Sequence, residues 1–409
     1  MEFGREFMMT FSSLRRRFLL AGALVAAAAT VVACSSGSTT DSSESSLSAS
    51  ESDSSTSSAA SESQTASTSA ESTDAASSGD NEATLDLFSS MTPRDGATPV
   101  DTSKFKTDKT DLTIGYVGFG LVNSWRVQAL GSVKQTAEKL GVKLVITDAG
   151  GDATKQISDA EDVLARGVDA LLISPVAPDA VVPVLEKATA SGIPVIVWGS
   201  DVNTDDITSR VVSDDKYFGE QGAEQLIKDM GGHGKVIMLR GIAGNSVEQA
   251  RYDGAASTLK QAGIEIVGED YGDWAYDKGK KIAENLIAAH PDINGIWSSG
   301  AEMTRGAIDA MNEAGLPLVP MSGENQNGFL KLAAKVGLKT SGPVFPTWQG
   351  PEALKLAVRA LHGEAIDSAY LVKPPTVTDA AAAAIPDVSD DYWVEDYLTL
   401  PEIKGIFPN

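Results

Sequence analysis

The chain has 409 residues, of which 33 are Lys or Arg and 56 are Asp or Glu, so its formal net charge is −23. Affinity for duplex nucleic acid comes largely from Lys and Arg on phosphates, so a chain this acidic is a poor nucleic-acid binder. It holds a single cysteine, which leaves no second thiol for an internal disulfide. Its stability must therefore come from a hydrophobic core.

The N-terminal residues have the pattern of an export signal. Arg15, Arg16 and Arg17 precede an apolar run from 18 to 33. That run is about 16 residues long, which is short for a membrane span of ~20 residues and typical of a cleavable signal. We interpret residues 1–33 as a signal peptide. A single transmembrane anchor is the alternative, and the arginine cluster is also similar to a twin-arginine export signal.

The run Val31-Val32-Ala33-Cys34 resembles a bacterial lipobox. The resemblance implies that the mature protein begins at Cys34 and carries acyl chains on that sulfur. The protein would then be extracytoplasmic and lipid-anchored to a bacterial membrane, and Cys34 would not serve as a catalytic thiol.

A long segment rich in Ser, Thr and Ala follows. From Ser35 to Met91 it contains no Lys or Arg and ten Asp or Glu. Such a segment cannot bury enough apolar surface to offset its ordering entropy, so we predict that residues 34–110 form a disordered tether. A flexible coil of roughly 60 residues spans about 45 Å. The tether would hold a folded body clear of a membrane; serine O-glycosylation is the alternative role.

From residue 111 onward, short apolar runs alternate with segments of helical period. Ser124 can cap the first helix, and Gly141 and Gly167 follow helix ends. The predicted strands cover 112–117, 143–147, 170–173, 194–198 and 209–212, and the predicted helices cover 124–140, 153–166 and 178–190.

The same alternation restarts at residue 235. Strictly alternating strands and helices predict parallel sheets with helices on both faces, and two successive sets predict two Rossmann-like lobes. A body of about 300 residues also exceeds the usual size of one core. The second set has predicted strands at 235–239, 265–267, 294–297 and 318–321, and predicted helices at 246–261, 276–289, 301–314, 327–334 and 347–361.

Aromatic and polar side chains gather where the predicted strands end, which is where open parallel sheets bind ligands. Five of the six tryptophans fall at or near such positions. A Trp face suits the C–H face of a sugar ring, and buried Arg and carboxylates bond vicinal hydroxyls. Trp198 and Trp297 are equally well explained as core residues, and Asp201 as a loop cap. The candidate ligand-binding residues are Asn123, Trp125, Arg126, Trp198, Asp201, Asn245, Arg251, Trp274, Glu302, Glu324 and Asn325.

Several motifs resemble those of the ribose- and galactose-type periplasmic binding proteins. The resemblance covers roughly residues 111–372. It implies a monomeric sugar-binding protein of an ABC importer, with two Rossmann-like lobes joined by a three-strand hinge, which closes on its ligand and docks on a membrane permease. The motifs are Asn123-Ser124-Trp125-Arg126 within 118–141, the stretch 241–246 followed by Arg251-Tyr252-Asp253-Gly254, Ala289-His290-Pro291-Asp292, and Glu302-Met303.

By that similarity, Asn123, Trp125 and Arg126 are ligand contacts of the first lobe, Arg251 binds hydroxyls, and Trp274 is a stacking aromatic. The first lobe would comprise residues 111–213 with 345–372. The second would comprise 214–344, with the chain returning at about 373. Residues 380–409 form a C-terminal extension beyond the family pattern, and no role follows for them.

Three positions depart from the ribose-type pattern. Gly199-Ser200 stands where the pattern has Asp-Arg, Gly300-Ala301 where it has Asn-Asp, and residues 321–324 where it has a Gly-Phe-Asp-Gly turn. These changes remove hydroxyl-binding groups. They argue against ribose and glucose and leave another sugar, a polyol or a non-sugar solute open.

An enzyme is the rival from a different class. Gly115, Gly118 and Gly120 have the reverse of the dinucleotide-binding spacing. The three histidines are scattered without the spacing of a zinc site, and no Gly-x-Ser-x-Gly elbow is present. We therefore predict a binding protein that is no enzyme and has no cofactor or metal. A sensor that passes its ligand signal to a membrane receptor is the second alternative.

Overall fold

The structure is a computed structural model that describes residues 85–340, 342–377, 380–395 and 397–408. The predicted signal peptide, Cys34 and the tether as far as residue 84 lie outside the described residues. In the part of the chain that is described, no helix combines the length and the apolar character that a membrane crossing requires.

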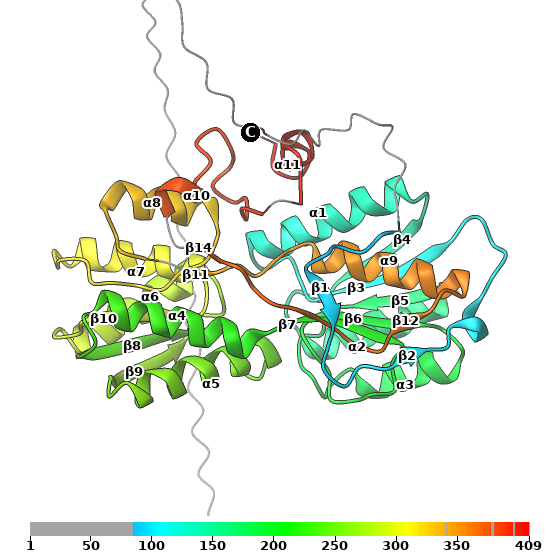
Figure 1. The fold of residues 1–409 in the computed structure, drawn as a ribbon, viewed down its shortest axis with the longest axis horizontal. Helices are drawn as coiled ribbons and strands as arrows, with labels where there is room; N and C mark the ends of the chain where they lie inside the picture. The colour runs from blue at the N-terminus through cyan, green and yellow to red at the C-terminus, as the bar shows by residue number, and fades with distance from the viewer. Residues whose placement is uncertain (1–84, 341, 378–379, 396, 409) are drawn as a thin grey trace, which may run out of the picture. The chain divides into compact units, whose positions relative to one another are not determined.

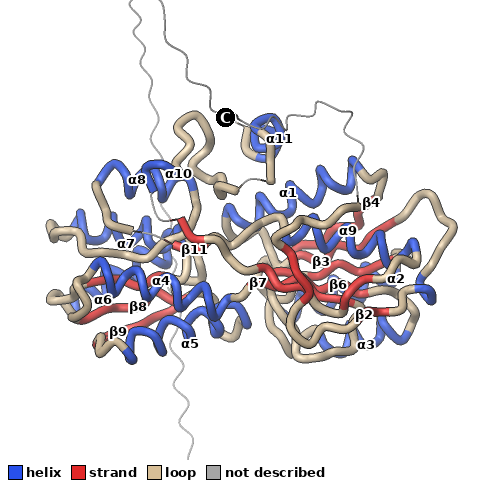
Figure 2. The backbone as a smooth tube through the Cα atoms, viewed as in Figure 1, coloured by secondary structure: helices blue, strands red, loops and turns tan. Residues whose placement is uncertain are grey.

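The first lobe is built on a seven-stranded sheet with helices on both faces (Figures 1 and 2). The strand order is β1-β13-β7-β6-β5-β3-β4, with β1 antiparallel to β13 and the other neighbours parallel. Helices α1 and α9 pack on one face, and α2 and α3 on the other. The elements are β1 (Met91–Pro93), β3 (Thr113–Gly118), α1 (Ser124–Lys139), β4 (Lys143–Asp148), α2 (Ala153–Ala165), β5 (Ala170–Ile173), α3 (Val182–Ala190), β6 (Val195–Gly199), β7 (Ser209–Ser213), α9 (Gln349–His362) and β13 (Tyr370–Val372).

Helices cover both faces of the central strands of this sheet, which explains the unbroken apolar runs of β5 and β6. Tyr116 and Leu172 belong to the hydrophobic cluster that includes α1 and α9, whereas Val117 and Ile173 belong to the cluster under α2 and α3. Successive side chains of a strand point to opposite faces, so each strand supplies both clusters. Two short strands, β2 (Pro99–Val100) and β12 (Ile366–Asp367), pair beside the main sheet, and a 3-10 turn covers Ser103–Phe105.

The second lobe has a parallel sheet in the order β10-β8-β9. Met321 extends it by a single parallel bridge to Ile296. Helices α4 and α5 pack together, as do α6 and α7. The elements are α4 (Asp215–Asp229), β8 (Lys235–Arg240), α5 (Ser246–Gln261), β9 (Glu265–Tyr271), α6 (Tyr276–Ala289), β10 (Gly295–Ser298), α7 (Ala301–Glu313) and α8 (Asn327–Val336).

Helices α4 and α5 approach each other at backbone distance. A Cβ on Gly219 would lie 1.9 Å from the carbonyl oxygen of Arg251, and one on Gly254 would lie 2.2 Å from that of Lys216. Real Cβ atoms do not come this close to a carbonyl oxygen, so glycine is required at both places. The close packing brings Asp215, at the start of α4, to the Arg251 side chain on α5.

The chain crosses between the lobes three times. It leaves the first sheet after β7, returns near β11 (Gly342–Pro343) to enter α9, and leaves again after β13, where β14 (Thr376–Val377) pairs with β11. These crossings and the two parallel sheets confirm the predicted fold class. Beyond them lie α10 (Ala380–Ala383) and α11 (Leu400–Ile406).

The structure differs from the sequence prediction in three places. Helix α4 was not predicted, because its two glycines weaken the helical pattern. The strand expected at 318–321 is reduced to the bridge at Met321, because Pro317 and Pro320 carry no N–H for a ladder.

The predicted tether ends earlier than residue 110. Residues 91–93 form β1 on the edge of the first sheet, and the Phe88 ring lies 4.9 Å from that of Trp348. The composition explains this change, since Leu85, Leu87, Phe88 and Met91 supply the apolar side chains that the serine-rich stretch lacks.

Candidate functional site

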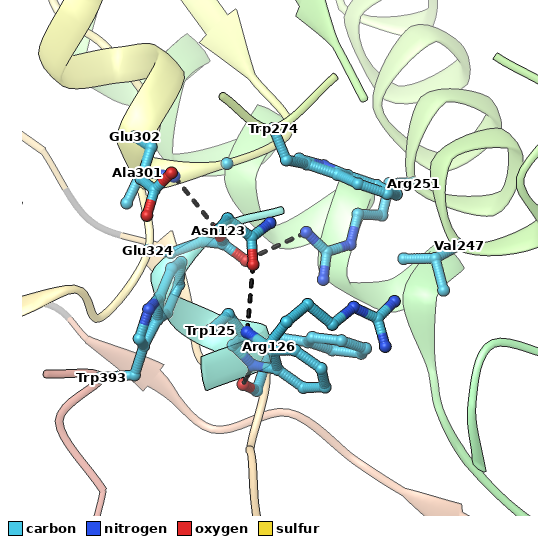
Figure 3. Close-up of a pocket in the computed structure, with 12 residues that line it drawn as sticks. Asn123, Trp125, Arg126, Val247, Arg251, Trp274, Ala301, Glu302, Glu324 and Trp393 are labelled. Atoms are coloured by element: carbon cyan, nitrogen blue, oxygen red, sulfur yellow. Dashed lines mark hydrogen bonds and ion pairs between the residues drawn. The ribbon is translucent and has the colours of Figure 1, made fainter. Parts of the chain in front are cut away.

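A cavity lies between the lobes and is lined by aromatic, cationic and acidic side chains (Figure 3). Helix α1 supplies residues from the first lobe, and α5 and α7 from the second. Single residues come from the hinge crossing and from the C-terminal extension. The lining residues are Asn123, Trp125, Arg126, Val247, Arg251, Trp274, Gly300, Ala301, Glu302, Glu324, Phe345 and Trp393.

The N-terminus of α1 presents Trp125 and Arg126 to the cavity. The Asn123 side chain caps the helix by accepting a hydrogen bond from the Arg126 N–H at 3.1 Å. Trp125 is 4% exposed and stacks on Phe345, with ring centroids 4.9 Å apart. Its indole N–H donates to the Phe345 carbonyl at 2.7 Å. This wall of the cavity is therefore fixed by a helix cap, a stack and a hydrogen bond.

Arg126 is a buried cation that has no carboxylate partner among the described residues. Its Nη1 donates to Ser174 Oγ at 2.7 Å, and its guanidinium lies 4.2 Å from the centre of the Phe119 ring. Burial lowers the pKa of this guanidinium to about 10. A cation held in this way gains by contact with any acceptor that enters the cavity.

Arg251 is the centre of a buried ion-pair network. Its Nε donates to Asp215 Oδ1 at 3.1 Å, and its Nη1 donates to Glu324 Oε1 at 3.0 Å and to the Ser299 carbonyl at 2.7 Å. Burial raises the pKa of Asp215 to about 7, against the attraction of Arg251, and also raises the pKa of Glu324. The network holds both the guanidinium and the Glu324 carboxylate in fixed positions at the cavity wall.

Trp274 forms the opposite aromatic wall, facing Trp125 across the space (Figure 3). Its backbone has φ 53°, a left-handed conformation that non-glycine residues rarely adopt. The indole N–H donates to Ser299 Oγ at 3.0 Å. A Cβ on Gly241 would lie 2.3 Å from the ring, and a Cβ on Gly300 would lie 2.8 Å from Trp274 Cδ1. The ring thus occupies a slot that two glycines leave free.

Glu302, on α7, joins the two lobes at the rim. Its Oε1 accepts from the Ser124 N–H at 3.2 Å, from Ser124 Oγ at 2.6 Å and from Gln326 Nε2 at 3.1 Å. Burial raises its pKa. The contacts to Ser124 link the second lobe directly to the first turn of α1.

Seven of the eleven predicted residues line this cavity, and four do not. Trp198 is fully buried and stacks behind Trp125, at a centroid distance of 6.1 Å. Asp201 pairs with Arg210 at 2.7 Å, outside the cavity. Asn245 caps α5 and bonds the Val176 carbonyl of the other lobe at 3.1 Å, while Asn325 Nδ2 bonds the Val394 carbonyl at 2.7 Å.

Several lining residues were not predicted. Val247, Gly300, Ala301 and Phe345 carry no polar group that would single them out, and Phe345 becomes visible only once the hinge crossing is known. Trp393 lies in the C-terminal extension, outside the repeating pattern, for which no role was predicted. Asp215 was missed together with α4.

The open space is small. The centre of a water molecule can occupy about 40 Å³ of it, which at ~10–15 Å³ per water amounts to about three waters. A sugar ring needs more room, so loading requires the lobes or the side chains to move. Among the described residues, no group of three or more His, Cys, Asp or Glu is placed to hold a metal ion.

Comparison with known proteins places this geometry in a family. Residues 114–365 match the model of the periplasmic binding protein domain. The chain belongs to that family. The ribose import binding protein of Bacillus subtilis (strain 168) is 30% identical over 287 residues, which cover 69% of this chain and 92% of that protein.

The chain is also similar in sequence and structure to galactofuranose-binding proteins. The galactofuranose-binding protein of Escherichia coli (strain K12) is 32% identical over 213 residues, half of this chain and 67% of its own length. A crystal structure of a galactofuranose binding protein superposes with a TM-score of 0.63 at 26% identity, covering 66% of this chain and 97% of that one. The predicted resemblance is thereby confirmed.

Two of the departures from the ribose-type pattern have a steric counterpart in this member of the family. A side chain at Gly300 would meet Trp274, as described above. A Cβ at Gly199 would lie 3.3 Å from Ser174 Oγ and 3.8 Å from Arg126 Nη1. Trp274 therefore occupies the space that a larger residue at Gly300 would fill, a side chain at Gly199 would crowd Ser174, and Glu324 provides a carboxylate in the third departing segment.

Proposed function

We propose that this protein captures a sugar or a related small polyol between its two lobes and delivers it to the membrane permease of an ABC importer. The observation that carries the proposal is the cavity itself, in which Trp125 and Trp274 face each other beside Arg126, Arg251 and Glu324. Flat aromatic faces suit the C–H face of a sugar ring, and charged groups make strong hydrogen bonds to hydroxyls. The relatives described above include a ribose-binding and a galactofuranose-binding protein, which support the same ligand class.

Arg126 gives the ligand a specific handle. Among the described residues, the Arg126 guanidinium donates to Ser174 Oγ. Its other N–H groups are therefore available to a hydroxyl or a ring oxygen of the ligand. Replacing Arg126 by Met should weaken ligand binding at least about tenfold, the effect of one charge-assisted hydrogen bond. Unchanged affinity would place the ligand elsewhere.

Binding would couple to lobe closure. Ligand contacts come from α1 on one lobe and from α5 and α7 on the other, so a ligand stabilises the closed arrangement by touching both. The proposal involves no bond-breaking step, since its charged groups serve to hold a ligand. The closed monomer would present surfaces of both lobes to the permease.

The location follows from the predicted N-terminus. Cys34 would carry the lipid that anchors the protein outside the cytoplasmic membrane, and the serine-rich tether would link it to the first lobe. In the native bacterium, Cys34→Ser should release the protein into soluble fractions. Continued membrane retention would favour an uncleaved transmembrane segment instead.

A thermal-shift screen of sugars, sugar acids and polyols tests the binding function. At a ligand concentration about 100 times Kd, a one-site binder gains about 2.7 kcal/mol of stability. The protein should show such a gain with at least one of these compounds, and equilibrium titration should give one site per chain. A screen without any shift, together with turnover of one of the compounds, would overturn the proposal.

A sensor role is the alternative for the same binding event. Uptake of the labelled compound by cells with and without the gene separates the two. Import is expected to fall in the deletion strain, whereas unchanged import with an altered transcriptional response would favour the sensor.

A further inference from the structure

The C-terminal extension carries an inference that goes beyond the family pattern. The match to the family ends at residue 365, yet residues 380–395 and 397–408 are folded against both lobes. The side chains of Val388, Tyr392 and Ile403 form a small hydrophobic cluster of their own. This segment is therefore a built part of the molecule.

The second lobe holds the segment through Asn327, which is completely buried at the start of α8. Its Nδ2 lies 2.9 Å from the Ile385 carbonyl and 3.0 Å from those of Val388 and Ser389, and its Oδ1 accepts from the Ile385 N–H at 2.8 Å. The preceding Asn325 exchanges two more bonds with the backbone of Val394, at 2.9 and 2.7 Å.

The first lobe holds the same segment through Gln128, a completely buried residue of α1. Its side-chain amide accepts from the Trp393 N–H at 2.8 Å and donates to the Trp393 carbonyl at 3.0 Å. Helix α11 packs closely on α1, since a Cβ on Gly131 would lie only 2.6 Å from Ile406 Cγ1. Gln135 Nε2 also donates to the Glu402 carbonyl at 3.0 Å.

Between these two attachments, Trp393 reaches the cavity (Figure 3). It is 3% exposed, and its indole N–H donates to Ser124 Oγ at 2.9 Å. That hydroxyl also donates to Glu302 and accepts from Gln326 Nε2 at 3.0 Å. One hydroxyl thus connects the first lobe, the second lobe and the C-terminal segment at the wall of the cavity.

We propose that residues 385–395 and 397–407 are a strap that fastens the two lobes together over the cavity, with Trp393 as its contact to the bound sugar or polyol. The ligand contact rests on the proposed function, whereas the fastening does not. The lobes cannot separate beside Trp393 while the side-chain amides of Gln128 and Asn327 both keep their hydrogen bonds to the strap. Ligand exchange therefore requires the strap to detach from one lobe. The strap therefore slows opening and closing, and Trp393 adds a third aromatic wall.

Spin-label distances in the full chain test the strap without any ligand. The protein carries Cys34→Ser, so that thiol labels go only to Glu186→Cys on the first lobe and Lys281→Cys on the second, both at exposed positions. We expect Asn327→Ala and Gln128→Ala to broaden the interlobe distance distribution toward longer values. Asn312→Ala, an exposed asparagine on α7, is the matched control and should leave the distribution unchanged.

The two variants release the strap from opposite lobes. If Asn327→Ala fails to fold, as judged by circular dichroism, Gln128→Ala alone decides. A distribution identical to that of the parent protein in every folded variant would overturn the strap.

Binding kinetics test the contact of Trp393, with D-galactose, L-arabinose and xylitol as probes. For a probe that the parent protein binds, Trp393→Ala should speed dissociation about tenfold and Trp393→Phe less, as for loss of an aromatic contact. Unchanged dissociation in Trp393→Ala would overturn the contact. If the parent protein bound no sugar or polyol, the contact would fail with the proposed function, and the spin-label result would still judge the strap.

Discussion

Replacing Arg251 by Met is expected to destabilise the fold as well as to abolish binding. The change leaves the side chains of Asp215 and Glu324, only 8% and 4% exposed, without their cation. Removing one partner of a buried ion pair costs about 3–5 kcal/mol, because each remaining carboxylate must either stay charged and desolvated or take up a proton. At roughly 2 °C per kcal/mol for a chain of this size, the melting temperature at neutral pH should fall by about 6–10 °C.

Differential scanning calorimetry of the ligand-free protein measures this effect. Lys260→Met, an exposed cation at the end of the same helix, is the control and should change stability by less than about 0.5 kcal/mol. Adding Asp215→Asn to Arg251→Met removes one unpaired charge and should recover part of the loss. A fall below about 2 °C in Arg251→Met would refute the reasoning, since the buried carboxylates would then not depend on Arg251.

Three further outcomes are expected. Burial raises the pKa of Asp215 from 3.8 to about 7, so between these values the folded protein holds a proton that the unfolded chain releases. The free energy of unfolding should therefore rise as the pH is lowered from about 8 to about 5. An equally steep pH dependence in Asp215→Asn would contradict this. Gly254→Ala places a Cβ against the backbone of α4 and should cost about 1–3 kcal/mol in urea unfolding, whereas the exposed Ser257→Ala should not. Gly300→Asn keeps a good helix cap but displaces Trp274, so binding should weaken without loss of melting temperature.

The sequence predicted the alternating fold well because burial on both faces of a sheet leaves a strong signal. Strands such as 170–173 are unbroken apolar runs, and helix ends carry glycine. Helix α4 was missed because it packs closely on α5, and this packing requires a glycine in the middle of the helix at Gly219. Where packing overrides local propensity, a pattern based on propensity loses the element.

The candidate site was predictable where one residue carries both a rare type and a strand-end position. Trp125 and Trp274 met that condition and line the cavity, whereas Arg251, which lies inside α5, was predicted from its motif. Asp201 met it too, but Arg210, nine residues along the chain, takes its carboxylate away from the cavity at 2.7 Å. Whether a carboxylate such as that of Asp201 binds a ligand or an arginine depends on which of them lies nearer in the folded protein, and the sequence does not give that distance.

The role of the C-terminal extension was beyond the sequence for a related reason. The three carbonyls that bond Asn327 belong to residues of no distinctive type. Every residue has a backbone carbonyl, so the sequence does not indicate which carbonyls will accept a hydrogen bond from a buried asparagine. Only the folded geometry brings Gln128 of one lobe and Asn327 of the other to the same C-terminal segment.

The pairing of β1 with β13 has a mechanical consequence. β13 lies beside β7, and both strands lead directly into crossings between the lobes. The chain that precedes residue 85 therefore joins the body on the first lobe, next to the pivot. With the proposed lipid on Cys34, a pull from the membrane would act on the first lobe close to these crossings, and the second lobe would be the one that moves on closure.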